Sequence, residues 1–126
     1  MKQTVHTTKE AMEFLRELGE FLRINNKNLK VGIAGSFARG EQTSSSDLDI
    51  VLDTYDDTVF SLQAHIAVDE YCSKHLAVPY DILWIKDLEE QDKVYDNLLM
   101  DNGLAINTGS AYKNIVRETR WADLEP

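Results

Sequence analysis

Two short apolar segments constrain the fold of this chain more than any other feature. The first is LKVGIA at 29–34, closed by Gly35, and the second is DLDIVLD at 47–53. Apolar runs of this length, bounded by glycine and polar residues, are typical of buried strands, whereas helices need longer periodic stretches. The sequence therefore predicts two strands of a sheet, joined by a connection rich in polar residues.

The second segment carries two acidic residues on one of its faces. Side chains two positions apart lie on the same face of a strand, so Asp47 and Asp49 point to the same side as Val51. The opposite face carries the apolar side chains expected in the core, which are Leu48, Ile50 and Leu52. Two carboxylates on one face of a strand require an explanation beyond packing.

The segment before these strands predicts an amphipathic helix that runs to about Ile24. Thr7 and Glu10 have the spacing of a capping box, in which each side chain accepts a hydrogen bond from the other residue's backbone N–H. Apolar residues then recur every three or four positions, which is the pattern of a buried helical face. These residues are Ala11, Phe14, Leu15, Leu18 and Leu22.

The second half of the chain predicts a helix, a strand and a second helix, followed by a tail beyond Asn107 that shows no clear pattern. The first helix is expected over Phe60–Leu76, with an imperfect apolar stripe of Leu62, Ile66 and Leu76 and with Val68 and Cys72 nearby. The strand is expected over Val78–Ile85. A long helix should follow, with Asp87 as its N-cap and Gly103 at its end, and then an edge strand over Leu104–Ile106. This order predicts one α/β or α+β domain over residues 1–126, with a small mixed sheet flanked by helices.

Composition excludes several classes of protein. The 126 residues carry a net charge of −9, which disfavours direct binding to DNA or RNA. There is no apolar stretch long enough to span a membrane and no signal-peptide pattern at the start, so we expect a cytoplasmic protein. Cys72 is the only cysteine and its helical setting favours packing over nucleophilic chemistry. The three histidines lack metal-ligand spacing and are interpreted as surface or packing residues.

The carboxylates predict a site for divalent metal ions. Transfer of a nucleotidyl group builds negative charge on the attacking and the leaving oxygen, and two Mg²⁺ ions about 4 Å apart can stabilise both. Asp47 and Asp49 supply two of the ligands. Asp81 is the candidate for a third, because it interrupts an apolar strand where an unpaired carboxylate would be costly. The alternative is an aspartate at a strand edge that caps a local group.

The residues between the first two strands fit a phosphate. Gly35 permits a tight turn with the backbone close to a ligand, and Ser36 offers a hydroxyl and an N–H at the start of a short helix. Arg39 either contacts the phosphates or forms an ion pair with an acid of the sheet. Gly109-Ser110 has no strand before it and no acid pair after it, so we interpret that pair as a loop.

Gly35-Ser36, ten further residues and Asp47-Leu48-Asp49 together resemble the signature of the nucleotidyltransferase superfamily that includes DNA polymerase beta and the aminoglycoside nucleotidyltransferases. With Ala38-Arg39-Gly40 and Ser46, the segment resembles the minimal nucleotidyltransferases (MNT) in particular. The resemblance extends over about residues 10 to 107. It implies the nucleotidyltransferase fold, Asp47, Asp49 and Asp81 as catalytic and metal-binding acids, and Gly35, Ser36 and Arg39 on the nucleotide.

The MNT type is a bare catalytic domain paired with a separate HEPN protein. The resemblance therefore implies an antitoxin that transfers AMP from ATP, with Mg²⁺, to a tyrosine of a HEPN ribonuclease toxin. Two alternatives stay open: transfer to a small molecule such as an aminoglycoside by a homo-oligomer, and a binding module that neutralises its partner without catalysis, through its acidic surface.

Overall fold

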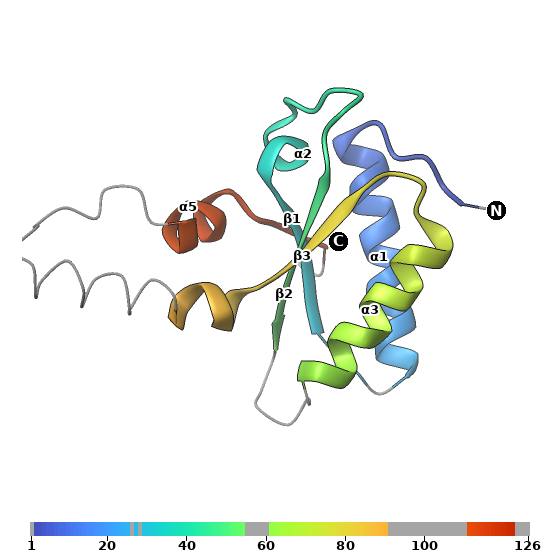
Figure 1. The fold of residues 1–126 in the computed structure, drawn as a ribbon, viewed down its shortest axis with the longest axis vertical. Helices are drawn as coiled ribbons and strands as arrows, with labels where there is room; N and C mark the ends of the chain where they lie inside the picture. The colour runs from blue at the N-terminus through green and yellow to red at the C-terminus, as the bar shows by residue number, and fades with distance from the viewer. Residues whose placement is uncertain (1, 26, 28, 55–60, 91–110, 123–126) are drawn as a thin grey trace, which may run out of the picture.

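A four-stranded mixed sheet forms the centre of the molecule (Figure 1). The computed structural model describes residues 2–25, 27, 29–54, 61–90 and 111–122. Within them the sheet has the order β3-β2-β1-β4, where β1 is Leu29–Ala34, β2 is Leu48–Thr54, β3 is Tyr80–Trp84 and β4 is Arg120–Trp121. β1 pairs antiparallel with both β2 and β4, whereas β3 pairs parallel with β2. The expected mixed sheet flanked by helices is confirmed.

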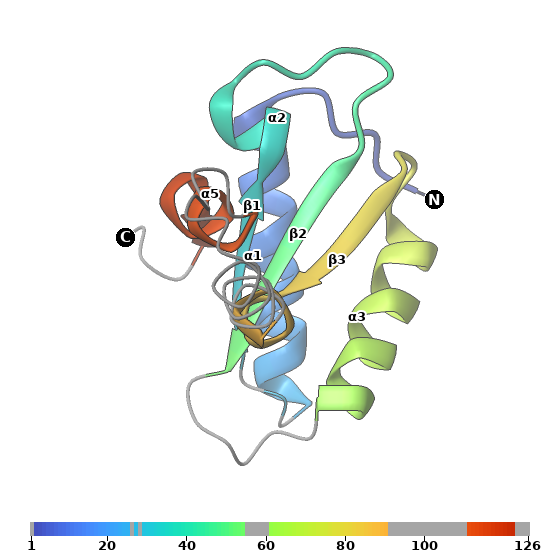
Figure 2. The same ribbon diagram turned by 60° about the vertical axis from the view of Figure 1, so that its left-hand side comes forward.

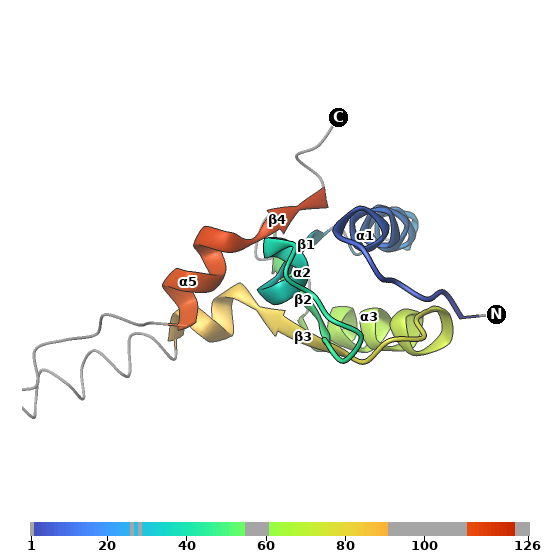
Figure 3. The same ribbon diagram turned by 90° about the horizontal axis from the view of Figure 1, so that it is seen from above.

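Helices cover both faces of this sheet. They are α1 (Thr8–Ile24), α2 (Gly35–Arg39), α3 (Ser61–His75) and α5 (Ala111–Glu118), with a further helix that begins directly after β3 and is described over 85–90. Viewed from above, α1 and α3 lie on one side of the sheet, and α5 with the helix at 85–90 lies on the other (Figure 3). No helix in the described part of the chain is both long and apolar enough to cross a membrane.

The predicted capping box at the start of α1 is confirmed. The Glu10 N–H donates to Thr7 Oγ1 at 3.1 Å, and the Thr7 N–H donates to Glu10 Oε1 at 3.2 Å. Two of the N–H groups that a helix start leaves without partners are thereby satisfied. The helix ends at Ile24, as the apolar periodicity predicts.

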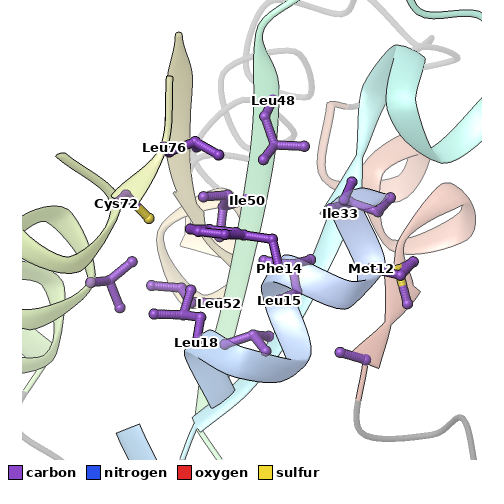
Figure 4. Close-up of a cluster of buried hydrophobic side chains, with 14 of the residues drawn as sticks. Met12, Phe14, Leu15, Leu18, Ile33, Leu48, Ile50, Leu52, Cys72 and Leu76 are labelled. Atoms are coloured by element: carbon purple, nitrogen blue, oxygen red, sulfur yellow. The ribbon is translucent and has the colours of Figure 1, made fainter. Parts of the chain in front are cut away.

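The main core lies between the sheet and the pair α1 and α3 (Figure 4). Leu48, Ile50 and Leu52 of β2 are completely buried there, against Phe14 and Leu18 of α1 among others. Burial of each such side chain stabilises the fold by about 1.5–3 kcal/mol before the entropy of ordering is subtracted. The alternation read from the second apolar segment is therefore correct.

The apolar stripe expected on α3 is wrong in part. Leu62 and Ile66 are 60% and 48% exposed. The buried positions recur at every fourth residue and are Ala64, Val68, Cys72 and Leu76. Spacing alone did not distinguish the two stripes, because both fit a helical period, and contact with the core selected the one with the smaller side chains.

The opposite face of the sheet has a smaller core of its own. Val51 is completely buried and packs with Ala34 and Ile85, while Ile115 and Trp121 close the cluster from α5 and β4. The apolar positions of this face are therefore covered as well.

Two predictions after β3 need correction or extension. The helix begins at Ile85, so Asp87 lies within its first turn and is not the N-cap. A negative charge is favourable in a first turn, which explains an aspartate there without a capping role. The predicted end of that helix near Gly103 and the strand over Leu104–Ile106 lie outside the described residues. The tail beyond Asn107, which showed no sequence pattern, contains α5 and β4.

β4 approaches β1 closely because Gly32 has no side chain. A Cβ at Gly32 would lie 2.7 Å from the Arg120 carbonyl oxygen and 2.9 Å from Thr119 Cγ2. Gly32 pairs with Trp121 in the register of the two strands. The glycine therefore allows the C-terminal segment to join the sheet beside the first strand.

Candidate active site

The sheet register brings the predicted acids together at one end. Asp49 of β2 is the cross-strand neighbour of Asp81 of β3, and Ala34 at the end of β1 is its neighbour on the other side. Asp47 lies just before β2. The starts of β2 and β3 and the helix α2 meet at the same end of the molecule (Figure 2). Residues directly opposite each other share a face of the sheet, so the side chains of Asp49 and Asp81 lie on one side.

The three acids differ in burial. Asp49 is half-buried, whereas Asp47 and Asp81 are exposed. The argument that burial made Asp81 costly is therefore wrong, although the position to which it led lies directly beside Asp49. Asp81 is exposed because it occupies the open end of the edge strand β3.

Negative charge accumulates around Asp49. Desolvation by burial raises the pKa of the Asp49 carboxyl, and repulsion from Asp81, Asp47 and Glu118 raises it further, while the nearby Arg39 guanidinium lowers it. Three other carboxylates are thus close enough to Asp49 to raise its pKa. Such an arrangement costs free energy in the isolated protein and favours the binding of cations.

Gly35 has a conformation and a position that only glycine fits. Its φ of +69° lies in the left-handed region. A Cβ at this position would overlap the Oδ2 atom of Asp49. The turn between β1 and α2 therefore rests directly against the carboxylate, which joins the Gly-Ser pair and the acid pair into one site.

The short helix α2 carries the other two predicted nucleotide-binding residues. Ser36 is its second residue, and its carbonyl oxygen accepts from the N–H groups of Gly40 and Glu41. Arg39 is its last residue and forms two ion pairs, from Nε to Glu41 at 3.0 Å and from Nη1 to Glu118 at 2.8 Å. The interpretation of Arg39 as an ion-pair residue is supported, but the acids lie on the loop and on α5 instead of on the sheet.

Glu118 is a site residue that sequence reasoning missed. It ends α5, accepts a hydrogen bond from the Gly35 N–H at 2.9 Å and pairs with Arg39. The residue lies 83 positions from Gly35 in a segment without a readable pattern. No spacing rule connects the two, so nothing in the sequence indicated the contact.

A divalent metal suits the chemistry of this site, although the conformation described does not form a complete ligand set. Within the described residues, no three acidic, histidine or cysteine side chains are close enough to hold one ion. The donors are nevertheless carboxylate oxygens on adjacent strands, which Mg²⁺ prefers, and their mutual repulsion at Asp49 is the charge that a cation neutralises. Asp47, Asp49 and Asp81 stay the predicted ligands.

Cys72 and His65 have packing roles. Cys72 is completely buried, and desolvation raises the pKa of its thiol to about 12, which leaves it unreactive near neutral pH. His65 Nδ1 accepts a hydrogen bond from Trp84 Nε1 at 3.0 Å. Neither residue contributes to the acid site.

Comparison with known proteins identifies this arrangement. Residues 13–105 match the family described as "Nucleotidyltransferase domain", a span that contains the Gly-Ser turn and all three acids. The chain belongs to this family. Its members carry out nucleotidyl transfer, so this protein is a nucleotidyltransferase whose family implies a nucleoside triphosphate as substrate.

Relatives of this nucleotidyltransferase cover most of its length. It is similar to "Putative protein adenylyltransferase MJ0126" of Methanocaldococcus jannaschii, with 34% identity over 67% of this chain and 99% of the relative. It is also similar to "Putative protein adenylyltransferase MJ1379" of the same organism, with 30% identity over 71% of this chain and 97% of the relative. No solved structure gives a significant match. These relatives confirm the minimal nucleotidyltransferase assignment.

Proposed function

We propose that the protein transfers AMP from ATP, with Mg²⁺, to a tyrosine hydroxyl of a partner HEPN ribonuclease toxin and acts as its antitoxin. The single observation that carries nucleotidyl transfer is the cross-strand pair Asp49 and Asp81 beside the Gly35 turn. The relatives named as protein adenylyltransferases support ATP as donor and a protein as acceptor. The HEPN partner rests on the resemblance to the MNT type.

Each residue of the site has a defined task in this reaction. Ser36 holds the triphosphate through its backbone N–H and hydroxyl, Arg39 does so through its guanidinium, and Gly35 lets the backbone approach it closely. Asp81, exposed at the end of β3, accepts the proton of the acceptor hydroxyl, whose oxygen bonds to the α-phosphorus as pyrophosphate leaves. Asp47, Asp49 and Asp81 would hold magnesium, which when bound supplies positive charge to the attacking and leaving oxygens.

The open acid site suits a macromolecular acceptor. Asp47 and Asp81 are exposed, and the described residues on this side of the sheet form no separate acceptor domain. An acceptor must therefore bring its own contacts, as a folded partner protein does. The net charge of −9 also favours a basic partner surface over a nucleic acid.

The proposal is tested by incubating the protein with ATP, Mg²⁺ and the purified product of the neighbouring gene. Intact-mass spectrometry should show the partner gain one or more AMP groups, and peptide mapping should place them on tyrosine. Asp49→Asn, which keeps the shape of the side chain, should abolish the gain. If the enzyme binds ATP but the mass of the partner does not change, protein adenylylation is refuted.

The two alternatives predict different results. A binding module that acts by contact alone predicts that Asp49→Asn protects cells from the partner as well as the wild type does. Transfer to a small molecule predicts nucleotidylation of an aminoglycoside in place of the partner, together with a homo-oligomer that builds the acceptor cleft.

A further inference from the structure

The carboxylate of Glu118 connects the two ends of α2. Its Oε1 accepts from the Gly35 N–H at 2.9 Å, and its Oε2 pairs with Arg39 Nη1 at 2.8 Å. Gly35 is the first residue of α2 and Arg39 is the last. The Glu118 side chain is 23% exposed, whereas the other partner of Arg39, Glu41, is 66% exposed. The better-shielded pair is the one that is less screened by solvent.

A helix of five residues depends on contacts from other elements for its geometry, because a single turn is unstable alone. Among the described residues, three side chains from other helices and strands supply such contacts to α2, in addition to Glu41 of the adjoining loop. Thr8 donates to the Phe37 carbonyl, and Arg120 Nε donates to the Ala38 carbonyl at 2.7 Å. Both act on the middle of the helix. Glu118 acts on Gly35 and Arg39 at its ends, which are two of the three predicted nucleotide-binding positions.

A movement of the Gly35 turn would also affect the acidic residues of the sheet. Because the turn rests against Asp49, any change in its position also changes the space available to that carboxylate. The Arg39 guanidinium belongs to the last residue of the same short helix and is held at Nε and Nη1. A side chain that fixes both groups therefore controls how the donors of α2 face the acids of the sheet.

We propose that Glu118 is a positioning residue for nucleotide binding, which orients the Gly35 turn and the Arg39 guanidinium toward the triphosphate. This role rests on the proposed ATP-dependent function and adds α5 to the nucleotide site. Glu118 acts through Gly35 and Arg39 and needs no contact with the nucleotide. The C-terminal segment thus contributes to substrate affinity as well as to the edge of the sheet.

Isothermal titration of ATP in the presence of Mg²⁺ and without acceptor tests this role. Loss of a charged hydrogen bond costs enough to weaken binding roughly ten- to a hundredfold, so Glu118→Ala should raise the Kd for ATP by that factor. Glu118→Gln keeps the shape and one acceptor oxygen, and its Kd should lie between those of the wild type and Glu118→Ala. The matched control Glu41→Gln removes the exposed partner of Arg39 and should stay within about threefold of the wild type.

The binding stoichiometry separates positioning from a merely structural role. A structural defect lowers the fraction of protein that binds and leaves the Kd unchanged, whereas a positioning defect raises the Kd at unchanged stoichiometry. Amide hydrogen exchange without ligand should also be faster at Gly35 in Glu118→Ala and unchanged there in Glu41→Gln. If Glu118→Ala does not fold, the Kd and the hydrogen exchange of Glu118→Gln test the inference in its place.

Two results would overturn the inference. One is an unchanged Kd in the Glu118 variants, and the other is tighter binding, which would mean that the carboxylate competes with the phosphates for the same donors. A wild-type protein that binds no ATP would instead refute the proposed function. If hydrogen exchange at the Gly35 amide is unchanged in Glu118→Ala, Glu118 does not fix the Gly35 turn, whether or not the protein binds ATP.

Discussion

Substitution of Gly35 by alanine probes the contact that joins the nucleotide-binding turn to the acids. Gly35 and Gly40 have nearly equal positive φ angles, +69° and +71°. A Cβ at Gly35 would overlap Asp49 Oδ2, whereas a Cβ at Gly40 would meet nothing within 4 Å. Gly40→Ala is therefore a matched control, because it introduces the same backbone strain without touching the acid.

The two variants should lose similar stability and very different amounts of activity. An alanine in the left-handed region costs roughly 1–2 kcal/mol, which lowers the melting temperature by about 3–8 °C in a domain of this size. In Gly35→Ala, Asp49 must also move on the order of 1 Å to reach ordinary contact, and such a displacement in a catalytic site can reduce the rate about a hundredfold. Gly40→Ala should stay within about threefold of the wild-type rate.

Thermal unfolding and initial rates of AMP transfer under saturating ATP measure both effects. Rates are compared below the melting temperature of the weaker variant, so that unfolding does not contribute. Equal rate losses in the two variants would refute the reasoning, because strain alone would then explain them. Wild-type activity in Gly35→Ala would show that the carboxylate does not need its described position.

Three further predictions follow from burial and charge. In metal-free buffer Asp49→Asn should raise the melting temperature at pH 7, because the pKa of Asp49 is raised in the folded state and ionisation of this carboxyl therefore destabilises the fold. The gain in melting temperature should vanish as the pH falls to about 3.8, the pKa in the unfolded chain, and a gain that does not change with pH would contradict this prediction. Cys72, with its pKa raised to about 12, should react with a thiol reagent at pH 8 only after unfolding, and prompt labelling of the native protein would disprove its burial. Leu18→Ala should cost about 2–5 kcal/mol in denaturant unfolding, against less than about 0.5 kcal/mol for the exposed Leu62→Ala, and similar losses would refute the assigned core.

The elements that could be predicted from the sequence are those with strong local signals. The capping box of Thr7 and Glu10 marked the start of α1, and alternation around Leu48 and Ile50 identified the core-facing side of β2. The signal was weaker on α3, where Leu62 fits the same helical period as the buried residues. Local patterns show which residues can share a face, but the choice between two faces depends on what packs against the helix.

The residues of the candidate site also differ in how far the sequence predicted them. Gly35, Ser36, Asp47 and Asp49 lie within one continuous segment whose spacing already resembled a nucleotidyltransferase. Asp81 was found by an argument from burial that the structure does not support, since the residue is exposed. Its place beside Asp49 depends on the parallel register of β3 with β2, which no local pattern specifies.

By itself, the sequence determined the chemistry of this protein: a glycine turn, two acids one residue apart where the second strand starts, and the spacing typical of the nucleotidyltransferase family. Only the tertiary structure decided how that chemistry is held in place. It put Asp81 next to Asp49, rested the Gly35 turn against a carboxylate and brought Glu118 to Gly35 across 83 positions of the chain. The physical reason is that residues close together in the sequence are kept near one another by the chain itself. Residues far apart in the sequence meet only when burial and strand pairing bring their segments together in one register.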